Sequence, residues 1–183
     1  MRNPLTTARG YLQLLGESTE GQSLRNYLDI IISEMDHANS ILSDFLLFSK
    51  NKSVELYLQN LNSIIQDNHP LLQAKAEKDH KLVVIKLDSA PPLNLDEKEI
   101  SKLIISLTLN GLEAIKPGGT VTISTRTEGD QVILSVQDTG KGIPLHLREI
   151  LGTPFLTTKD SRIGLGLAVC YSIAARHNAT LSY

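Results

Sequence analysis

One long helical repeat limits the folds open to this chain more than any other feature. Over about three heptads, the apolar residues recur at alternating steps of four and three: Leu24, Leu28, Ile31, Met35, Ala38, Leu42 and Phe45. This spacing places an apolar seam along one side of an α-helix. With Ser23 as the N-cap, the pattern predicts a helix from about Ser23 to Lys50.

A shorter amphipathic segment precedes this helix. Its apolar residues share one helical face, and a polar turn over Gly16 to Gly21 follows them: Leu5, Ala8, Leu12 and Leu15. Two antiparallel helices bury their apolar stripes poorly by themselves, so we predict that a second copy completes a four-helix bundle. The alternative is that the hairpin packs against the rest of its own chain.

The remainder of the chain mixes strand-like and helix-like segments. We predict strands over Val54–Leu58, Leu82–Leu87, Thr120–Arg126, Gln131–Val136 and from Ala179 to Tyr183. Helices are predicted over Leu61–Lys78, with a kink or break at Pro70, Glu97–Ile115 and Gly164–Arg176. The polar break Asn51–Ser53 then separates a hairpin domain, 1–52, from an α+β domain, 53–183, with helices on one face of a mixed sheet.

Composition excludes several classes of protein. The net charge is −2 and no long basic run occurs, which argues against a nucleic-acid binder. The single cysteine, Cys170, excludes an intramolecular disulfide framework and is expected to be a small core residue. No apolar run is long enough to span a bilayer, so we expect a cytoplasmic portion, with any membrane anchor elsewhere in a longer parent protein. The abrupt start at Met1 suggests a fragment.

The stretch Asp138–Ile143 reads Asp-Thr-Gly-Lys-Gly-Ile and comes just after the predicted strand Gln131–Val136. Gly140 and Gly142 allow positive φ and a close approach of a ligand to the backbone. A carboxylate at the strand end can accept a hydrogen bond from the exocyclic amine of adenine, whereas the carbonyl of guanine would repel it. Two interpretations stay open at this point, an adenine pocket and an ordinary turn.

Three further groups have chemistry suited to phosphate. Asn110 is polar within a leucine-rich helix, and its amide oxygen can ligate Mg²⁺. Lys159 follows Thr157 and Thr158 in a long loop and can neutralise a terminal phosphate. Gly164-Leu165-Gly166-Leu167 opens the last helix, where backbone N–H groups suit phosphate. Taken singly, each is also explained as a hydrogen-bonded Asn, a surface lysine or an ordinary helix start.

Together, the order of these motifs resembles the ATP-binding domain of sensor histidine kinases over about residues 54–183. The resemblance implies an α/β-sandwich ATPase domain of the histidine kinase/Hsp90 type that binds ATP and Mg²⁺. Asn110 would be the magnesium ligand of the N box, and Asp138 would bind the adenine amine. The remaining implied nucleotide contacts are Gly140, Gly142 and Ile143 in the G1 box, Thr158 and Lys159 in the F box, and Gly164, Leu165, Gly166 and Leu167 in the G2 box.

The N-terminal hairpin resembles the dimerisation and phosphotransfer hairpin of the same family. Arg2-Asn3-Pro4-Leu5 is similar to the end of the H box, and Thr6 to Leu15 resembles sporulation-type kinases. The resemblance places the phosphoacceptor histidine two residues before Met1. Two departures stand out: Ser106 replaces the first Asn of the N box, and Arg162-Ile163 replaces the small residues before Gly164.

The resemblance implies an ATP-dependent protein-histidine kinase that forms a homodimer through the hairpin and passes its phosphoryl group to a response regulator. Hydrolytic relatives need a carboxylate one turn before the Asn, where this chain has Ser106. The alternative is a catalytically incomplete, dimeric nucleotide-binding module that docks a partner or an inhibitor protein on the bundle. The sequence leaves open the signal, the cognate regulator, and autophosphorylation within or between subunits.

Overall fold

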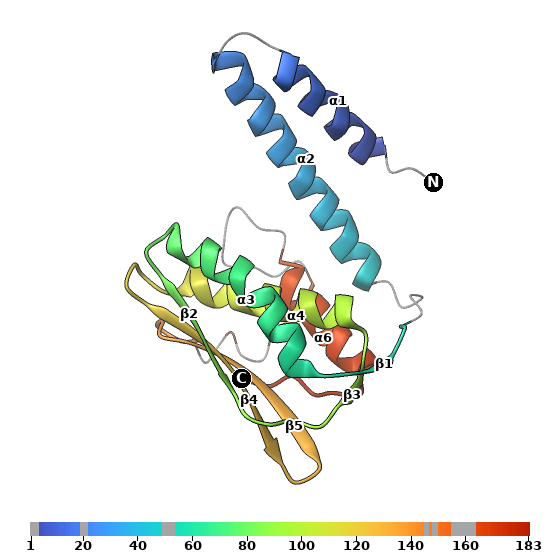
Figure 1. Cartoon of the computed structure of the whole chain (residues 1–183), viewed down its shortest axis with the longest axis vertical. Coiled ribbons are helices and arrows are strands. Elements are labelled where there is room, and N and C mark those ends of the chain that lie inside the picture. Colours follow the sequence, from blue (N-terminus) through green and yellow to red (C-terminus); the bar gives the residue numbers. More distant parts are fainter. Residues whose placement is uncertain (1–3, 19–21, 49–53, 145–146, 148–149, 155–163) are drawn as a thin grey trace. The chain divides into compact units, whose positions relative to one another are not determined.

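The computed structural model describes the chain except for residues 1–3, 19–21, 49–53, 145–146, 148–149 and 155–163. The chain folds into two compact units, Met1–Ser49 and Lys50–Tyr183. Figure 1 draws both units. The predicted boundary between residues 52 and 53 falls at the edge of a range outside the described residues and stays a prediction.

The first unit is a helical hairpin of α1 (Pro4–Ser18) and α2 (Gln22–Phe48). An ion pair joins the two helices, with Arg9 Nε 2.7 Å from Asp36 Oδ1. The helix α2 begins at Gln22, so Ser23 lies inside the helix and the prediction of Ser23 as its N-cap is wrong. The helix α1 extends through Gly16 to Ser18 and shortens the expected turn, because α-helical hydrogen bonding continues past the last apolar residue of its stripe.

Three of the six seam residues of α2 whose burial the structure describes are exposed to solvent in the single chain. Leu28 is buried, but Leu24 is 50% exposed, Ile31 45% and Leu42 48%. On α1, Tyr11, Leu14 and Leu15 are likewise exposed. The hairpin therefore presents a long apolar surface of the kind that oligomer interfaces cover.

The second unit is an α+β layer structure, as predicted. Its main sheet has the order β2-β4-β5, formed by β2 (Leu82–Leu87), β4 (Thr120–Glu128) and β5 (Gln131–Asp138). β2 and β4 are parallel, and β4 and β5 form an antiparallel hairpin. Figure 1 shows α3 (Leu61–Glu77), α4 (Glu97–Ala114) and α6 (Gly166–Arg176) on one face of this sheet.

Two local predictions for this unit are wrong, and of the kink or break predicted at Pro70 the break does not occur. The first strand, β1 (Tyr57–Gln59), begins later than expected and pairs with an unpredicted strand, β3 (Leu93–Leu95). No strand forms over 179–183 in the structure, where Ala179 N–H instead donates to Ala174 O and closes α6. The helix α3 runs through Pro70 without a break. Each depends on pairing or packing with distant residues, which local patterns do not contain.

The core lies between the helices and the sheet. Its fully buried side chains come from all three helices and the central strand: Ile65, Leu72, Ile104, Val121, Ile123, Val169 and Ile173. Cys170 is also buried, as predicted for a small core residue. These contacts fix α4 and α6, the two helices that carry candidate site residues.

One polar group in this core lacks compensation. Thr108 on α4 is fully buried, and its hydroxyl has no hydrogen-bond partner among the described residues. We expect Thr108→Val to raise the free energy of unfolding by about 1 kcal/mol, because burying an unpaired hydroxyl is unfavourable. Urea denaturation measures the change.

Thr125→Val is the matched control for this prediction. Thr125 is also buried, but its hydroxyl donates to Asn62 Oδ1 at 2.8 Å. That substitution should destabilise the protein by about 1 kcal/mol, since it leaves Asn62 without its donor. Destabilisation of similar size in both variants would show that the Thr108 hydroxyl is paired after all.

Side chains of α3 cover the outer edge of β2. Val83 N–H donates to Gln73 Oε1 at 3.0 Å, and His69 Nε2 lies 3.1 Å from Val83 O. An uncovered edge strand is a template for pairing with another chain. Gln73 and His69 therefore protect this side of the sheet.

No helix of the described chain is both long and apolar enough to cross a membrane.

Candidate functional site

The helix α4 provides the floor of the candidate site. Asp96 caps it by accepting a hydrogen bond from Glu99 N at 3.1 Å, and acidic residues in its first turn suit the helix dipole. One stripe of α4 is buried against the core. Another carries Ser106 and Asn110, both half-buried, and Ala114, which is exposed. Since these three residues are four apart, they follow one side of the helix over about 12 Å.

Asp138 ends β5 in a tight turn. Its Oδ1 accepts a hydrogen bond from Gly140 N at 2.7 Å. A Cβ at position 140 would lie 2.6 Å from that oxygen and 2.8 Å from the Ala114 carbonyl oxygen, so only glycine fits. The turn uses one carboxylate oxygen of Asp138 and holds the side chain against the C-terminal end of α4.

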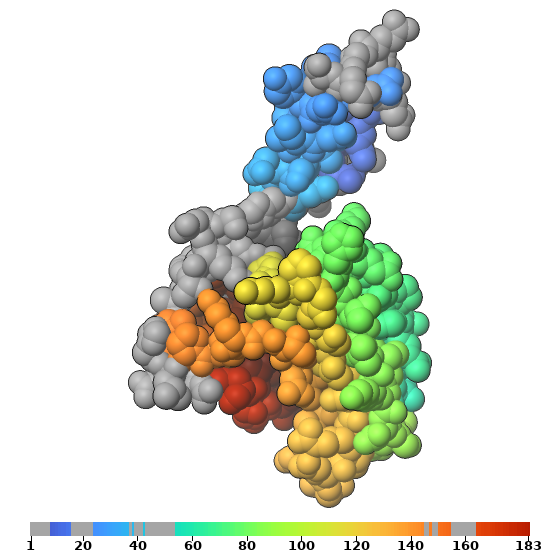
Figure 2. All heavy atoms as spheres, turned by 90° about the vertical axis from the view of Figure 1, so that its left-hand side faces the viewer, coloured from blue at the N-terminus to red at the C-terminus, as the bar shows by residue number. Residues whose placement is uncertain are grey.

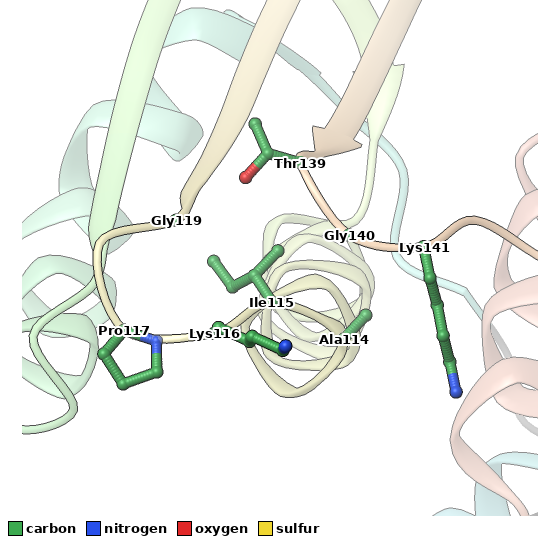
Figure 3. Close-up of a pocket in the computed structure, with 8 residues that line it drawn as sticks. All are labelled: Ala114, Ile115, Lys116, Pro117, Gly119, Thr139, Gly140 and Lys141. Atoms are coloured by element: carbon green, nitrogen blue, oxygen red, sulfur yellow. The ribbon is translucent and has the colours of Figure 1, made fainter.

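A second close contact joins Asp138 to α4. A Cβ at Gly111 would lie 3.4 Å from Asp138 Cβ and 3.1 Å from a methyl group of Val121. Beside this junction is a pocket of about 350 Å³, lined by Ala114, Ile115, Lys116, Pro117, Gly119, Thr139, Gly140 and Lys141 (Figure 3). Because Gly111 and Ala114 are small, the end of β5 packs closely against α4, and the pocket lies next to this contact.

The N-terminus of α6 reaches the opposite end of the stripe. A Cβ at Gly166, the first residue of α6, would lie 3.2 Å from Ser106 Oγ. Leu165 is the N-cap, is 4% exposed and makes no side-chain capping hydrogen bond. Gly164 has φ of +73°, which favours glycine. No acidic residue occupies the first turn of α6, which leaves its N–H groups suited to an anion.

The C-terminus of α6 is fixed to the start of α4. Arg176 Nε lies 3.0 Å from Glu99 Oε2, and its Nη2 donates to Oε1 at 3.1 Å. Glu99 is only 1% exposed. Asp96 N–H donates to His177 Nε2 at 3.0 Å, so the proton of the neutral ring is on Nδ1, which lies 2.9 Å from Ile173 O.

A contact with a loop residue also helps to hold α6 in place. Gly152 lies against the ring of Tyr171, where an added Cβ would be 2.3 Å from a ring carbon. Burial raises the pKa of Tyr171 above its ordinary value, with further contributions from the charge of Tyr183 and a hydrogen bond to it. Gly152 is thus packed on the same helix that begins with Gly166.

Gly152 offers a clear test of that packing. It has φ of +81°, and we expect Gly152→Ala to destabilise the protein by more than about 2 kcal/mol, because the cost of positive φ and the clash with Tyr171 add. Gly129→Ala is the control, since Gly129 has φ of +62° but faces open space. Equal thermal shifts in the two variants would contradict a packed contact.

The structure brings some predicted site residues together. Asp138 and Gly140 meet the C-terminal half of α4, Gly166 meets Ser106, and Asn110 lies between these two contacts on α4. Figure 2 shows the yellow end of α4 beside the orange segment that follows β5. Gly142 has φ of +71° and Ile143 is 39% exposed, whereas Leu167 is half-buried. Thr158 and Lys159 lie outside the described residues.

Two family models match the chain. Residues 1–54 match the His Kinase A (phospho-acceptor) domain, and residues 95–183 match the histidine kinase-, DNA gyrase B-, and HSP90-like ATPase domain. The catalytic domain of the histidine kinase ThkA is 30% identical, with a TM-score of 0.62 over 68% of this chain and 82% of that one. The chain belongs to the sensor histidine kinase family.

Longer relatives align with almost the whole chain. Sporulation kinase C of Bacillus subtilis (strain 168) is 33% identical over 99% of this chain and 42% of its own length. A structure of ThkA in complex with the response regulator protein TrrA is 26% identical, with a TM-score of 0.69 over 96% of this chain and 52% of that one. The chain thus spans less than half the length of this curated kinase.

The sequence patterns of this histidine kinase chain did not reveal every residue of the site. Gly111 and Ala114 look like ordinary helix residues, yet they provide the close contacts with Asp138 and Gly140. The available signal was two small residues within an otherwise leucine-rich helix. The contact between Gly152 and Tyr171 has no comparable signal, since it joins a loop and a helix.

Proposed function

We propose that this chain is the core of a histidine kinase that binds Mg-ATP along α4. The observation that carries the proposal is the order of contacts on one helix. Asp138 and Gly140 adjoin its C-terminal half, Asn110 follows toward the N-terminus, and Ser106 meets the first residue of α6. The carboxylate suits the adenine amine, and the uncapped start of α6 suits phosphates.

Asn110 is the residue we propose to hold Mg²⁺. The described residues contain no cluster of three or more His, Cys, Asp or Glu placed to bind a metal. A single amide oxygen fits Mg²⁺, which commonly takes its other ligands from water and substrate phosphates. When bound, the ion offsets phosphate charge. We propose Thr158 and Lys159 as further phosphate contacts, and Gly142, Ile143, Gly164, Leu165 and Leu167 as backbone or side-chain walls.

The hairpin is proposed as the dimerisation and phosphotransfer domain, 1–52, and residues 53–183 as the ATP-binding domain. The exposed seam of α2 supports a homodimer, because Leu24, Ile31 and Leu42 would be covered by a second copy. In the parent protein, a histidine nitrogen would attack the γ-phosphorus, release ADP, and later transfer the phosphoryl group to an aspartate of a response regulator.

Calorimetric titration with the non-hydrolysable analogue AMPPNP and Mg²⁺ tests nucleotide binding. We expect one site per chain that excludes the corresponding guanine analogue. The chain extended at its N-terminus by His-Glu should then acquire an acid-labile label from γ-labelled ATP. Binding without labelling would favour the second candidate, a nucleotide-binding module that docks another protein on the bundle; no binding by a folded dimer would contradict the kinase proposal.

A further inference from the structure

We infer that Ser106 is a positioning residue that sets how closely the N-terminus of α6 approaches α4. The inference rests on the proposed nucleotide site and names a determinant of its phosphate end. Its basis is the contact between Ser106 Oγ and Gly166, where even a methyl group would be only 3.2 Å from the oxygen. Among real side chains, that approach is tighter than ordinary van der Waals contact.

The two helices touch at two separated points. At one end, Arg176 and His177 of α6 bond to Glu99 and to the backbone of Asp96. At the other end, Gly166 lies against Ser106. The helices α4 and α6 are antiparallel, since the start of α4 meets the end of α6. About 15 Å of helix separates the two points.

A rigid helix held at one end is oriented by its second contact. Arg176 is fixed through a bidentate pair with a carboxylate that is 1% exposed, which leaves little freedom there. Core packing of Val169 and Ile173 holds the middle of α6, and the sizes of the side chains at 106 and 166 set how closely its first turn approaches α4. That turn lacks a side-chain cap, and its N–H groups are the proposed phosphate donors.

The role we assign to Ser106 depends on its volume rather than on its hydroxyl. Ser106 and Asn110 are one turn apart on the same side of α4. A small residue at 106 lets α6 begin about one turn of α4 from Asn110, so that one ligand could reach both the proposed magnesium ligand and the helix start. Position 106 then controls affinity for the phosphates and leaves the adenine end, at Asp138, unaffected.

A double-variant experiment tests the inference. Gly166→Ala should raise the Kd of Mg-AMPPNP about fivefold to tenfold, the effect of weakening about one hydrogen bond. Ser106→Ala should leave it within about twofold, and Ser106→Ala/Gly166→Ala should restore it to within about twofold of the unaltered protein. Affinity for adenosine, measured by NMR shift titration, should stay constant in all three variants.

Thermal stability separates positioning from damage to the fold. Alanine favours helix over glycine, so Gly166→Ala should not lower the melting temperature although it weakens AMPPNP binding. Ser101→Ala is the control on the same helix, since Ser101 Oγ accepts a hydrogen bond from Asn68 Nδ2 at 2.9 Å. That variant should lose stability and keep its ratio of AMPPNP to adenosine affinity.

Three results would overturn the inference. A tenfold loss in Ser106→Ala alone would make the hydroxyl the contact, and a double variant as weak as Gly166→Ala would remove the steric coupling. Unchanged AMPPNP binding in Gly166→Ala would also rule out a steric effect of position 166 on phosphate binding. Failure of the proposed function looks different, because the unaltered protein would then bind neither AMPPNP nor adenosine, and the inference would fall with it.

Discussion

Asp138→Asn should lower the affinity for AMPPNP about 100-fold and leave the fold intact. In the structure, Asp138 Oδ1 accepts a hydrogen bond from Gly140 N. An asparagine keeps an oxygen for that turn but presents an N–H₂ group in place of the second carboxylate oxygen. A donor would then face the donor amine of adenine, and the charge that strengthens the hydrogen bond would be lost. Calorimetry gives the affinity and urea denaturation the stability.

The matched control is Asp130→Asn at the other end of the same strand pair. Asp130 lies in the turn between β4 and β5 and is exposed. The same change of carboxylate to amide there should leave AMPPNP affinity unchanged. Asp138→Ala adds a second comparison, because it removes the turn acceptor as well and should lower both affinity and stability. Equal affinities for Asp138→Asn and the unaltered protein would refute the adenine-binding role.

Arg176→Met should lower the free energy of unfolding by about 3–5 kcal/mol. The change leaves the carboxylate of Glu99, 1% exposed, without the guanidinium that compensates its burial. It also removes the bond from Arg176 Nη1 to Ser172 Oγ. Urea denaturation followed by circular dichroism measures the loss, and calorimetry on the folded variant shows its effect on AMPPNP affinity.

An exposed ion pair provides the control for this prediction. Arg126 Nε and Glu128 Oε1 are 2.6 Å apart, closer than the Arg176 pair, but the two side chains are 51% and 59% exposed. Arg126→Met should cost less than about 1 kcal/mol, because water replaces the lost partner. Glu99→Leu/Arg176→Met should recover most of the stability, since it removes the buried charge as well. Similar losses in Arg176→Met and Arg126→Met would contradict the importance of burial.

The sequence predicted those elements whose signals are local. The strand pair β4 and β5 was predicted from the strand-like runs Thr120–Arg126 and Gln131–Val136, and α4 from the helical pattern over Glu97–Ile115, with Gly129 and Asp96 as the local turn and cap signals in the sequence. Those residues do form the two-residue turn and the N-cap. The family motifs also indicated Asp138 and Gly166 as site residues, a role that remains a proposal. In each case, the decisive residues are within a few positions of one another.

What the sequence could not predict depends on contacts between distant positions. Glu99 looks like a first-turn acidic residue, and only the approach of Arg176, 77 residues later, explains its burial. The strands β1 and β3 contain three residues each and form because they pair with each other. The meeting of Ser106 with Gly166 joins two helices whose separate patterns contain no information on their spacing.

The two edges of the main sheet differ in how accessible they are to another strand. Gln73 and His69 occupy the hydrogen-bonding groups of Val83 on the outer side of β2, so an added strand would first have to displace them. At the other border, no strand of the described chain pairs with the outer side of β5. At Val83 an added strand would meet these two side chains, so the outer side of β5, the strand that ends in Asp138, is the more accessible border for another strand. A strand added there would also support the strand that carries the proposed adenine-binding residue.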